Sequence, residues 1–134
     1  MRKLKIFIAH SSTDRDWARR FALALREFEA DVWFDGFNIK PGDSIPELVE
    51  AGLRGSDVVV LLVDKESLVR PNFFFELGAA LGLNKRIVAI VSEESAEAGL
   101  PLPILRKKYL VRKSPEETAK ELAAGLELIR GEAA

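Results

Sequence analysis

Two unbroken apolar runs constrain the fold of this chain more than any other feature of its sequence. The first run is "DVVVLLV" at residues 57–63, and the second is "RIVAIV" at residues 86–91. Strands that are apolar on both faces are typical of the middle of a parallel sheet, because helices cover both sides of such a sheet. The two runs therefore predict an α/β fold with a central parallel sheet.

Other strand patterns and helical patterns alternate around these two runs. Three further strands are predicted at residues 3–9, 31–34 and 107–112. Apolar residues at helical spacing predict helices over about 13–29, 45–54 and 72–83, and a last helix that begins at Ser114. Residues 92–103 are rich in turn formers and predict a loop with room for one short helical turn.

This alternation selects a flavodoxin-like architecture. Strands joined through helices form a parallel sheet with right-handed crossovers, which places helices on both faces. For five strands, the expected order in the sheet is 2-1-3-4-5. The 134 residues are enough for one hydrophobic core, so we expect a single domain over residues 1–134.

Capping residues mark where three of the helices begin. Thr13 with Asp16 three residues later is an acidic variant of a capping signature, and Ser44 with Glu47 forms a capping box. Ser114 is followed by proline, which is favoured in the first turn of a helix. These residues predict helix starts close to positions 13, 45 and 115.

The composition excludes several classes of function. The net charge of -1 gives no overall field toward nucleic acid or an anionic membrane. The absence of cysteine rules out disulfides, thiolate metal sites and cysteine nucleophiles, and it is compatible with a reducing cytosol. No apolar stretch approaches the roughly 18 residues needed to cross a bilayer. We expect a cytoplasmic protein that binds neither nucleic acid nor membrane.

The sheet order also predicts where a ligand binds. In sheets of this kind, ligands bind beyond the carboxyl ends of the strands, near the switch point between the first and third strands. Three segments reach that edge, namely "AHSS" after the first strand, "DGFNIKPGDS" after the second, and "DKESLVRPN", which leads to Glu76. The candidate site should therefore be built from these segments.

Glu76 is the acid with the most unusual surroundings. It lies about one turn into the third predicted helix, where the helix dipole could stabilise its charge. Phe73, Phe74, Phe75 and Leu77 surround it in the sequence and could exclude water from the carboxylate, which would raise its pKa. A lone carboxylate in a cleft can stabilise or attack an oxocarbenium ion at the anomeric carbon of a sugar. Both interpretations of Glu76 remain open at this stage.

The other polar candidates have simpler explanations. Asp35 and Asp64 end the second and third strands and could cap the loops that follow. His10 is the only histidine, and "AHSS" lacks the Gly-x-Ser-x-Gly turn of a hydrolase nucleophile. With one histidine and no cysteine, a metal site is not expected. Serine hydrolase chemistry is not expected either.

Two features could bind parts of a nucleotide. The loop "FNIKPGDS" offers Lys40, a glycine backbone and Ser44 at a helix N-terminus to a phosphate. Trp33 alternates with Val32 along a strand and belongs either to the core or to a cleft wall. If Trp33 reaches the cleft, its ring could stack on a nicotinamide or adenine ring. The chain has no Gly-x-Gly-x-x-Gly motif and no Walker lysine, so ordinary dinucleotide or P-loop binding is unsupported.

Taken together, these segments resemble a bacterial Toll/interleukin-1 receptor (TIR) domain over about residues 4–112. The matching stretches are "KIFIAHSSTDRDWARRFALAL", "EADVWFD", "NIKPGDSI", "GLRGSDVVVLLV" and "FFFELGAALGLNKRIVAIV". The resemblance implies an NAD+ nucleosidase that cleaves the nicotinamide–ribose bond and gives ADP-ribose or a cyclic isomer. It also implies a role in antiphage defence or cell-death signalling, with NAD+ as substrate and no separate cofactor.

The resemblance assigns roles to individual residues. Glu76 matches the catalytic glutamate of the family. The expected substrate-binding residues are His10, Ser11, Ser12, Trp33, Asp35, Phe37, Lys40 and Asn72. The family's mobile "BB" loop corresponds to residues 37–44, in which Asn38, Pro41, Gly42 and Asp43 would gate the site and contact neighbouring domains.

Two positions depart from the family pattern. Asn72 lies four residues before Glu76, where members commonly have tryptophan, and Phe37 replaces a polar or acidic ribose contact of some NAD-cleaving members. These departures bear on substrate identity and catalytic efficiency.

Two alternative functions therefore stay open. One is a non-catalytic module that works through TIR–TIR contacts. The other is an enzyme similar to nucleoside 2-deoxyribosyltransferases, because the stretch "FELGAALG" resembles the segment of those enzymes in which a nucleophilic glutamate precedes "LG". Self-association is the expected partner interaction, and a sensor domain or protein is left open.

Overall fold

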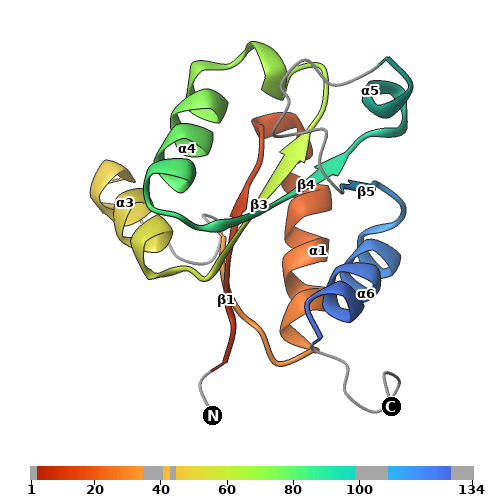
Figure 1. The fold of residues 1–134 in the computed structure, drawn as a ribbon, viewed down its shortest axis with the longest axis horizontal. Coiled ribbons are helices and arrows are strands. Elements are labelled where there is room, and N and C mark those ends of the chain that lie inside the picture. The colour runs from red at the N-terminus through yellow and green to blue at the C-terminus, as the bar shows by residue number, and fades with distance from the viewer. Residues whose placement is uncertain (1–2, 35–40, 43–44, 99–108, 128–134) are drawn as a thin grey trace.

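Five parallel strands form one sheet in the computed structural model, which describes residues 3–34, 41–42, 45–98 and 109–127 (Figure 1). The strands are β1 (Lys5–Ala9), β2 (Asp31–Trp33), β3 (Val58–Val63), β4 (Arg86–Val91) and β5 (Leu110–Val111). Their order is β2-β1-β3-β4-β5, and each neighbouring pair is parallel. The predicted α/β fold class and the flavodoxin-like strand order are confirmed.

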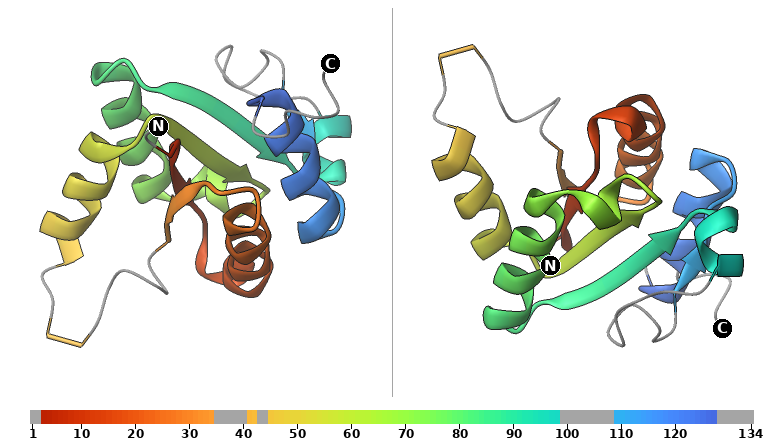
Figure 2. Two further views of the ribbon diagram at one scale, coloured as in Figure 1. Left: turned by 90° about the horizontal axis from the view of Figure 1, so that it is seen from below. Right: turned by 90° about the horizontal axis from the view of Figure 1, so that it is seen from above.

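Helices cover both faces of this sheet (Figures 1 and 2). The helices are α1 (Arg15–Arg26), α3 (Ile45–Gly55), α4 (Pro71–Gly82), α5 (Glu93–Ala98) and α6 (Pro115–Gly125), with short 3₁₀ turns η1 (Ser12–Asp14) and η2 (Ser67–Val69). Helices α1 and α6 pack on one face, and α3 and α4 pack on the other. No helix among the described residues is long and apolar enough to cross a membrane.

The alternation of side chains along the strands builds two hydrophobic cores. In β1, Ile6 and Ile8 point toward α1 and α6, whereas Phe7 and Ala9 point toward α3 and α4. All six side chains of β3 are buried, three in each core. Burial of each such aliphatic side chain contributes roughly 1.5–3 kcal/mol. The unbroken apolar run of β3 is therefore a consequence of its central place in the sheet.

The helix boundaries differ from the predictions mainly at the start of α1. Thr13 does not cap this helix: the N-cap residue is Asp14, and the Thr13 hydroxyl group donates to the Glu66 carboxylate at 2.8 Å. Residues Ser12–Asp14 instead form η1, and α1 begins at Arg15. The helix ends at Arg26, short of the predicted residue 29, and Glu29 has a positive φ of 63°. The capping prediction for Thr13 is wrong because the 3₁₀ turn delays the start of the helix and places Asp14 at the N-cap position.

The other boundaries agree more closely with the sequence. Ser114 Oγ accepts a hydrogen bond from the Glu117 backbone N–H at 3.1 Å, so the predicted start of α6 is confirmed. The expected helical turn after β4 is α5, which has six residues. The final strand is shorter than predicted, since β5 covers only Leu110–Val111. Ser44 lies outside the described residues, so its capping box stays a prediction.

Candidate active site

Chain order brings several turns together at one edge of the sheet. η1 follows β1, η2 and the start of α4 follow β3, and α5 follows β4, so all of them lie beyond carboxyl ends of strands (Figure 1). We call this side of the molecule the carboxyl edge. It is the edge at which a sheet of this order binds ligands.

Glu76 lies in the second turn of α4 on the border between the core and solvent. Phe73, Leu77 and Ala80 form the buried face of this helix, and Glu76 is three residues from Phe73 and four from Ala80. Its side chain is half-buried. The first turn of α4 contains no acidic residue, and the effect of a helix dipole fades beyond the first turn. The interpretation of Glu76 as a first-turn acid is therefore not supported.

The phenylalanines before Glu76 do not all exclude water from it. Phe73 is buried, and its ring contacts Phe74 edge-on at a centroid distance of 5.2 Å. Phe74 is 42% exposed and Phe75 is 70% exposed. Successive residues of an α-helix point about 100° apart, so three in a row cannot share one face. Of the three rings only that of Phe73 is buried, so the expectation that they exclude water from the carboxylate is not supported for Phe74 and Phe75.

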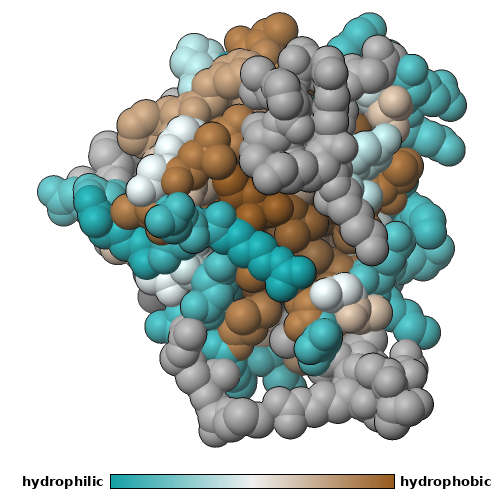
Figure 3. Space-filling model, viewed as in Figure 1, coloured by the Kyte–Doolittle hydropathy of each residue, from teal (hydrophilic) through white to brown (hydrophobic). Residues whose placement is uncertain are grey.

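Exposed apolar side chains gather on the same part of the molecule. Val69 in η2 is 79% exposed, next to the exposed rings of α4. The space-filling view shows hydrophobic surface over η2 and α4 at its upper left (Figure 3). Exposed apolar surface of this kind is frequent at sites of interaction.

The turn after β1 is well ordered by local hydrogen bonds. His10 Nδ1–H donates to the Ser11 carbonyl oxygen at 2.8 Å, and the His10 ring lies 5.1 Å from the Phe34 ring. Ser11 is buried, and its hydroxyl group is 2.9 Å from that of Thr13. The Asp14 backbone N–H donates to the Ser11 carbonyl oxygen at 3.1 Å. The two predicted binding residues His10 and Ser11 therefore belong to one compact turn at the carboxyl edge.

Three charged residues that follow three different strands come together next to this turn. Arg112 donates to both carboxylate oxygens of Asp14, at 2.8 and 3.2 Å, across 98 residues of sequence. The side chains of Arg112 and Asp14 are only 15% and 10% exposed. Asp64 is the third member, because it and Asp14 each shift the pKa of the other. We call Asp14, Asp64 and Arg112 the strand-end cluster.

The two carboxyl groups of the strand-end cluster have opposite pKa shifts. Burial raises the pKa of Asp64, and the hydrogen bond with Asp14 raises it further, although the Ser67 N–H partly opposes the rise. Burial would also raise the pKa of Asp14, but the hydrogen bonds and charge of Arg112 outweigh burial and lower it. Asp14 is therefore the member that holds the negative charge most firmly.

Sequence reasoning found only one member of this cluster. Asp64 was expected to cap its loop, and its Oδ1 does accept from the Ser67 backbone N–H at 2.8 Å. Asp14 and Arg112 were missed, because a pair separated by 98 residues has no local signature. The only available signal was a charged residue directly after the third and the fifth strands, at Asp64 and Arg112.

A chain of surface contacts links the turn after β1 to the start of α4. Thr13 donates to Glu66 at 2.8 Å, and Glu66 pairs with Arg70 at 3.5 Å. Arg70 is the N-cap residue of α4, the helix that carries Glu76. The structure thus connects the turn that holds His10 and Ser11 to the helix that holds Glu76.

Trp33 packs between the sheet and α3. Its indole stacks on the Phe7 ring at a centroid distance of 4.7 Å and an interplanar angle of 12°. The backbone of Gly52 lies against the same indole, so closely that a Cβ atom at position 52 would be 2.8 Å from Nε1 and Cε2. Contact between Trp33 and a nicotinamide ring stays a prediction.

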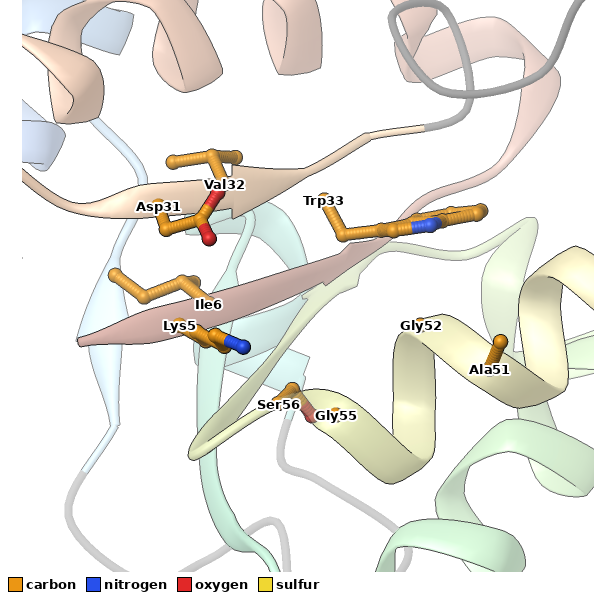
Figure 4. A pocket seen from close by; sticks show the side chains of 9 residues that line it. All are labelled: Lys5, Ile6, Asp31, Val32, Trp33, Ala51, Gly52, Gly55 and Ser56. Carbon is orange, nitrogen blue, oxygen red and sulfur yellow. The ribbon is translucent and has the colours of Figure 1, made fainter. Parts of the chain in front are cut away.

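Trp33 also forms one wall of a pocket of about 220 Å³ (Figure 4). Lys5 and Asp31, the first residues of β1 and β2, line this pocket together with Gly55 and Ser56 at the end of α3. The pocket therefore lies at the amino ends of the strands, away from the carboxyl edge that holds His10 and Ser11.

Several predicted site residues lie outside the described part of the chain. These are Asp35, Phe37, Asn38, Lys40 and Asp43. Ser12 and Asn72 are placed in η1 and α4, but their side chains are not described. Pro41 and Gly42 form an exposed turn in which Gly42 has a φ of 92°, a conformation that favours glycine. Within the described ranges, no group of three or more His, Cys, Asp or Glu side chains could hold a metal ion.

The sequence matches known proteins over most of its length. A family profile described as "TIR domain" matches residues 6–127. The "2' cyclic ADP-D-ribose synthase AbTIR" of Acinetobacter baumannii (strain 1295743) is 40% identical over 62 residues, which are 44% of this chain and 23% of that protein. The "NAD(+) hydrolase PdTIR" of Paracoccus denitrificans (strain Pd 1222) is 41% identical over 59 residues, or 42% of this chain and 20% of that protein.

A longer alignment relates the chain to a protein of Brucella abortus (strain 2308). The "Probable 2' cyclic ADP-D-ribose synthase TcpB" of that organism is 30% identical over 125 residues, which are 87% of this chain. The alignment covers 50% of that protein. The chain therefore spans between about a fifth and a half of the length of these relatives.

Two solved structures with the same fold are a TIR domain and a nucleotide glycosidase. The TIR domain of the Toll-related receptor TRR-2 from Hydra magnipapillata has a TM-score of 0.67 and 15% identity, and the match covers 93% of this chain and 94% of that one. The CMP N-glycosidase BcmB of Clostridium botulinum has a TM-score of 0.66 and 18% identity, with 90% and 98% covered. At these identities, the two likenesses establish the fold.

Proposed function

Because the chain belongs to the TIR domain family, we propose that it cleaves NAD+ at the bond between nicotinamide and ribose. Relatives named as an NAD+ hydrolase and as cyclic ADP-ribose synthases support this activity. The observation that carries the proposal is Glu76, a half-buried acid on α4 that matches the catalytic glutamate of the family. Helix α4 follows β3, so it begins at the edge where this sheet binds ligands.

In this proposal Glu76 acts on the charge that develops as the bond breaks. The glycosidic nitrogen of NAD+ is already cationic, so nicotinamide leaves as a neutral molecule with the bonding electron pair and needs no proton. Positive charge then develops on C1′ and the ring oxygen of the ribose. The Glu76 carboxylate stabilises that charge, or forms a bond to C1′, in a setting from which water is partly removed.

The product depends on which oxygen then reaches C1′. Attack by water gives ADP-ribose and one proton. Attack by a hydroxyl group of the same ADP-ribosyl unit gives a cyclic isomer and one proton. The names of the relatives include both outcomes, and one carboxylate serves either. We therefore propose that the access of water to the intermediate determines whether the product is ADP-ribose or a cyclic isomer.

The remaining predicted binding residues complete the proposal. His10 and Ser11 lie in the compact turn after β1, which contacts link to the start of α4. Position 72 lies one helical turn before Glu76. We assign to the substrate the residues His10, Ser11, Ser12, Trp33, Asp35, Phe37, Lys40 and Asn72.

Purified protein and its Glu76→Gln variant test this function. Wild-type protein is expected to release nicotinamide from NAD+, and Glu76→Gln should lower kcat at least about 100-fold, because the charge opposite the ribosyl cation is lost. Glu50→Gln on α3 is the matched control, since Glu50 is exposed and pairs with Arg54 on the same helix. Chromatography of the products distinguishes ADP-ribose from cyclic isomers.

The same assay separates competing functions. CMP and deoxynucleosides should be left intact, and turnover of either in place of NAD+ would favour the glycosidase or deoxyribosyltransferase alternative. The fold of the Clostridium botulinum CMP N-glycosidase makes CMP the appropriate competing substrate. Equal turnover of NAD+ by wild type and Glu76→Gln would refute the role of Glu76.

Self-association through the loop around Pro41 and Gly42 is a second candidate function. Both residues are exposed, and the positive φ of Gly42 would strain any side chain added there. Gly42→Ala should therefore reduce the assembled fraction measured by sedimentation, whereas Gly82→Ala, at a helix position with open space, should not. Assembly without NAD+ cleavage would favour a purely non-catalytic module. Assembled, active protein would fit a part in bacterial immune or cell-death signalling, with loss of cellular NAD+ as its readout.

A further inference from the structure

We propose that the strand-end cluster, Asp14 with Asp64 and Arg112, positions the turn after β1 so that His10 and Ser11 can bind NAD+. This inference rests on the proposed function, which assigns those two residues to the substrate. The cluster residues themselves are positioning residues and need not touch NAD+. Their proposed effect is on substrate affinity rather than on the bond-breaking step.

The cluster joins three strand ends that are far apart in the sequence. Asp14 follows β1, Asp64 follows β3, and Arg112 follows β5. The guanidinium group of Arg112 holds Asp14 with two parallel hydrogen bonds of 2.8 and 3.2 Å. Two-pronged contacts of this kind restrict the orientation of the carboxylate as well as its distance. The side chain of Asp14 is therefore held in one place relative to the sheet.

Asp14 passes this constraint to the binding turn. Its backbone N–H donates to the Ser11 carbonyl oxygen at 3.1 Å, and the Ser11 hydroxyl group lies 3.5 Å from its carboxylate. The Ser11 carbonyl oxygen also accepts from His10 Nδ1–H at 2.8 Å. Ser11 is thus in contact with both the anchored residue and the histidine. A shift of Asp14 would move both predicted binding residues.

A second set of contacts, exposed to solvent, also connects the turn to the rest of the fold. Thr13 donates to Glu66, and Glu66 pairs with Arg70 at the N-cap of α4. The turn is therefore attached to β5 through buried contacts and to α4 through exposed ones. Because Glu76 is on α4, both attachments bear on how the turn faces the candidate catalytic acid.

A contribution to stability does not by itself explain the buried pair of Arg112 and Asp14. A buried ion pair often contributes no more stability than apolar side chains of similar volume. In addition, the Nε atom of Arg112 is buried without a hydrogen-bond partner among the described residues, and such a group is costly to bury. Arg112 stacks over the Trp17 ring at 4.8 Å, which also orients its guanidinium group. The directional contacts of Arg112 with Asp14 and Trp17, together with the cost of burying its Nε atom, favour a role in positioning Asp14.

Steady-state kinetics of Arg112→Lys and Asp14→Asn test the proposal. Lysine keeps the charge but cannot form the two-pronged contact. Both variants should raise KM for NAD+ at least fivefold and change kcat less than twofold, after correction for the folded fraction. An unchanged KM with an apparent kcat that falls in proportion to the folded fraction would mean that the cluster is only structural, and the proposal would fail.

A matched control comes from another long-range ion pair. Arg20 and Glu116 join α1 to α6 at 2.8 Å across 96 residues, but their side chains are 62% and 55% exposed. Glu116→Gln should leave KM within twofold of the wild-type value. If Glu116→Gln raises KM as much as Arg112→Lys does, general loosening of the fold explains the effect and the proposal is overturned.

Amide hydrogen exchange gives a readout that does not depend on NAD+ cleavage. The Asp14 amide reports closure of the turn, and Arg112→Lys should speed its exchange at least tenfold more than that of the β3 amides. Glu116→Gln should not. If the wild-type protein fails to cleave NAD+ but Arg112→Lys still speeds exchange of the Asp14 amide, the proposed function is refuted, whereas the anchoring of the turn by the cluster is supported. If neither the Asp14 amide nor KM responds to Arg112→Lys, the positioning role is refuted.

Discussion

Asp14 and Asp64 show at the residue scale how one environment can act oppositely on two identical side chains. Each of the two carboxyl groups influences the titration of the other, yet the pKa of Asp14 is lowered and that of Asp64 is raised. Arg112 contacts both oxygens of Asp14, whereas burial dominates at Asp64. The position of each carboxyl group relative to the Arg112 guanidinium group therefore decides whether folding favours or disfavours its charged form.

The same substitution at the two positions should have opposite effects on stability. At neutral pH, Asp14→Asn leaves the buried charge of Arg112 without its partner and should lower the free energy of unfolding by about 3 kcal/mol. Asp64→Asn removes a buried charge and keeps an oxygen for the Ser67 N–H, so it should raise the free energy of unfolding. Urea unfolding of both variants checks this, and a loss of stability in both would contradict it.

At the scale of elements, the close packing of α3 on β2 depends on a glycine. Gly52 is the helix residue that faces Trp33, and a Cβ there would come within 2.8 Å of the indole ring. Alanine is otherwise the better helix former by about 1 kcal/mol. The packing requirement and the helical preference therefore oppose one another at this position.

Two glycine substitutions on neighbouring helices distinguish these effects. Gly52→Ala should lower the free energy of unfolding by about 1–3 kcal/mol, because the ring or the helix must move. Gly78→Ala on α4 meets nothing within 4 Å and should raise it by up to about 1 kcal/mol. Thermal unfolding of the two variants compares them directly. Equal stabilisation by both substitutions would show that the Trp33 ring can move to make room for the added methyl group without loss of stability.

At the scale of the whole molecule, the last part of the chain returns to the first. Helix α6 packs on α1 in one core, and Trp17 Nε1–H donates to the Lys113 carbonyl oxygen at 3.2 Å. The Arg112–Asp14 pair lies next to this contact. Both ends of the described chain therefore contribute to one cooperative unit.

The acid stability of the whole domain should reflect Asp14. Its pKa is lowered by folding from the ordinary 3.8, so its contribution is present above pH 3.8 and is lost as the pH falls through the folded-state value. The stability difference between wild type and Asp14→Asn should thus be full at neutral pH and shrink below pH 3.8. Unfolding free energies measured against pH check this, and a difference that grows toward low pH would be inconsistent with it.

Much of the fold could be predicted because its signals are local. The run that became β3 and the run that became β4 were both located from hydrophobicity alone, and Ser114 marked the start of α6. Thr13 shows where such reasoning fails, since its capping signature is present but a 3₁₀ turn places Asp14 at the N-cap position instead. Phe74 and Phe75 show a second limit, because an apolar run in the sequence does not reveal which of its side chains are buried.

The sequence by itself determined the strand order and the placing of helices on both faces, and it predicted the edge of the sheet at which a ligand would bind. Each follows from the period and order of apolar segments, which neighbouring residues encode. Only the tertiary structure decided that Arg112 meets Asp14 and Asp64, that Trp33 packs against Gly52, and that Glu76 borders the core. These features depend on contacts between distant segments and on the direction of side chains, and neither exists until the chain has folded.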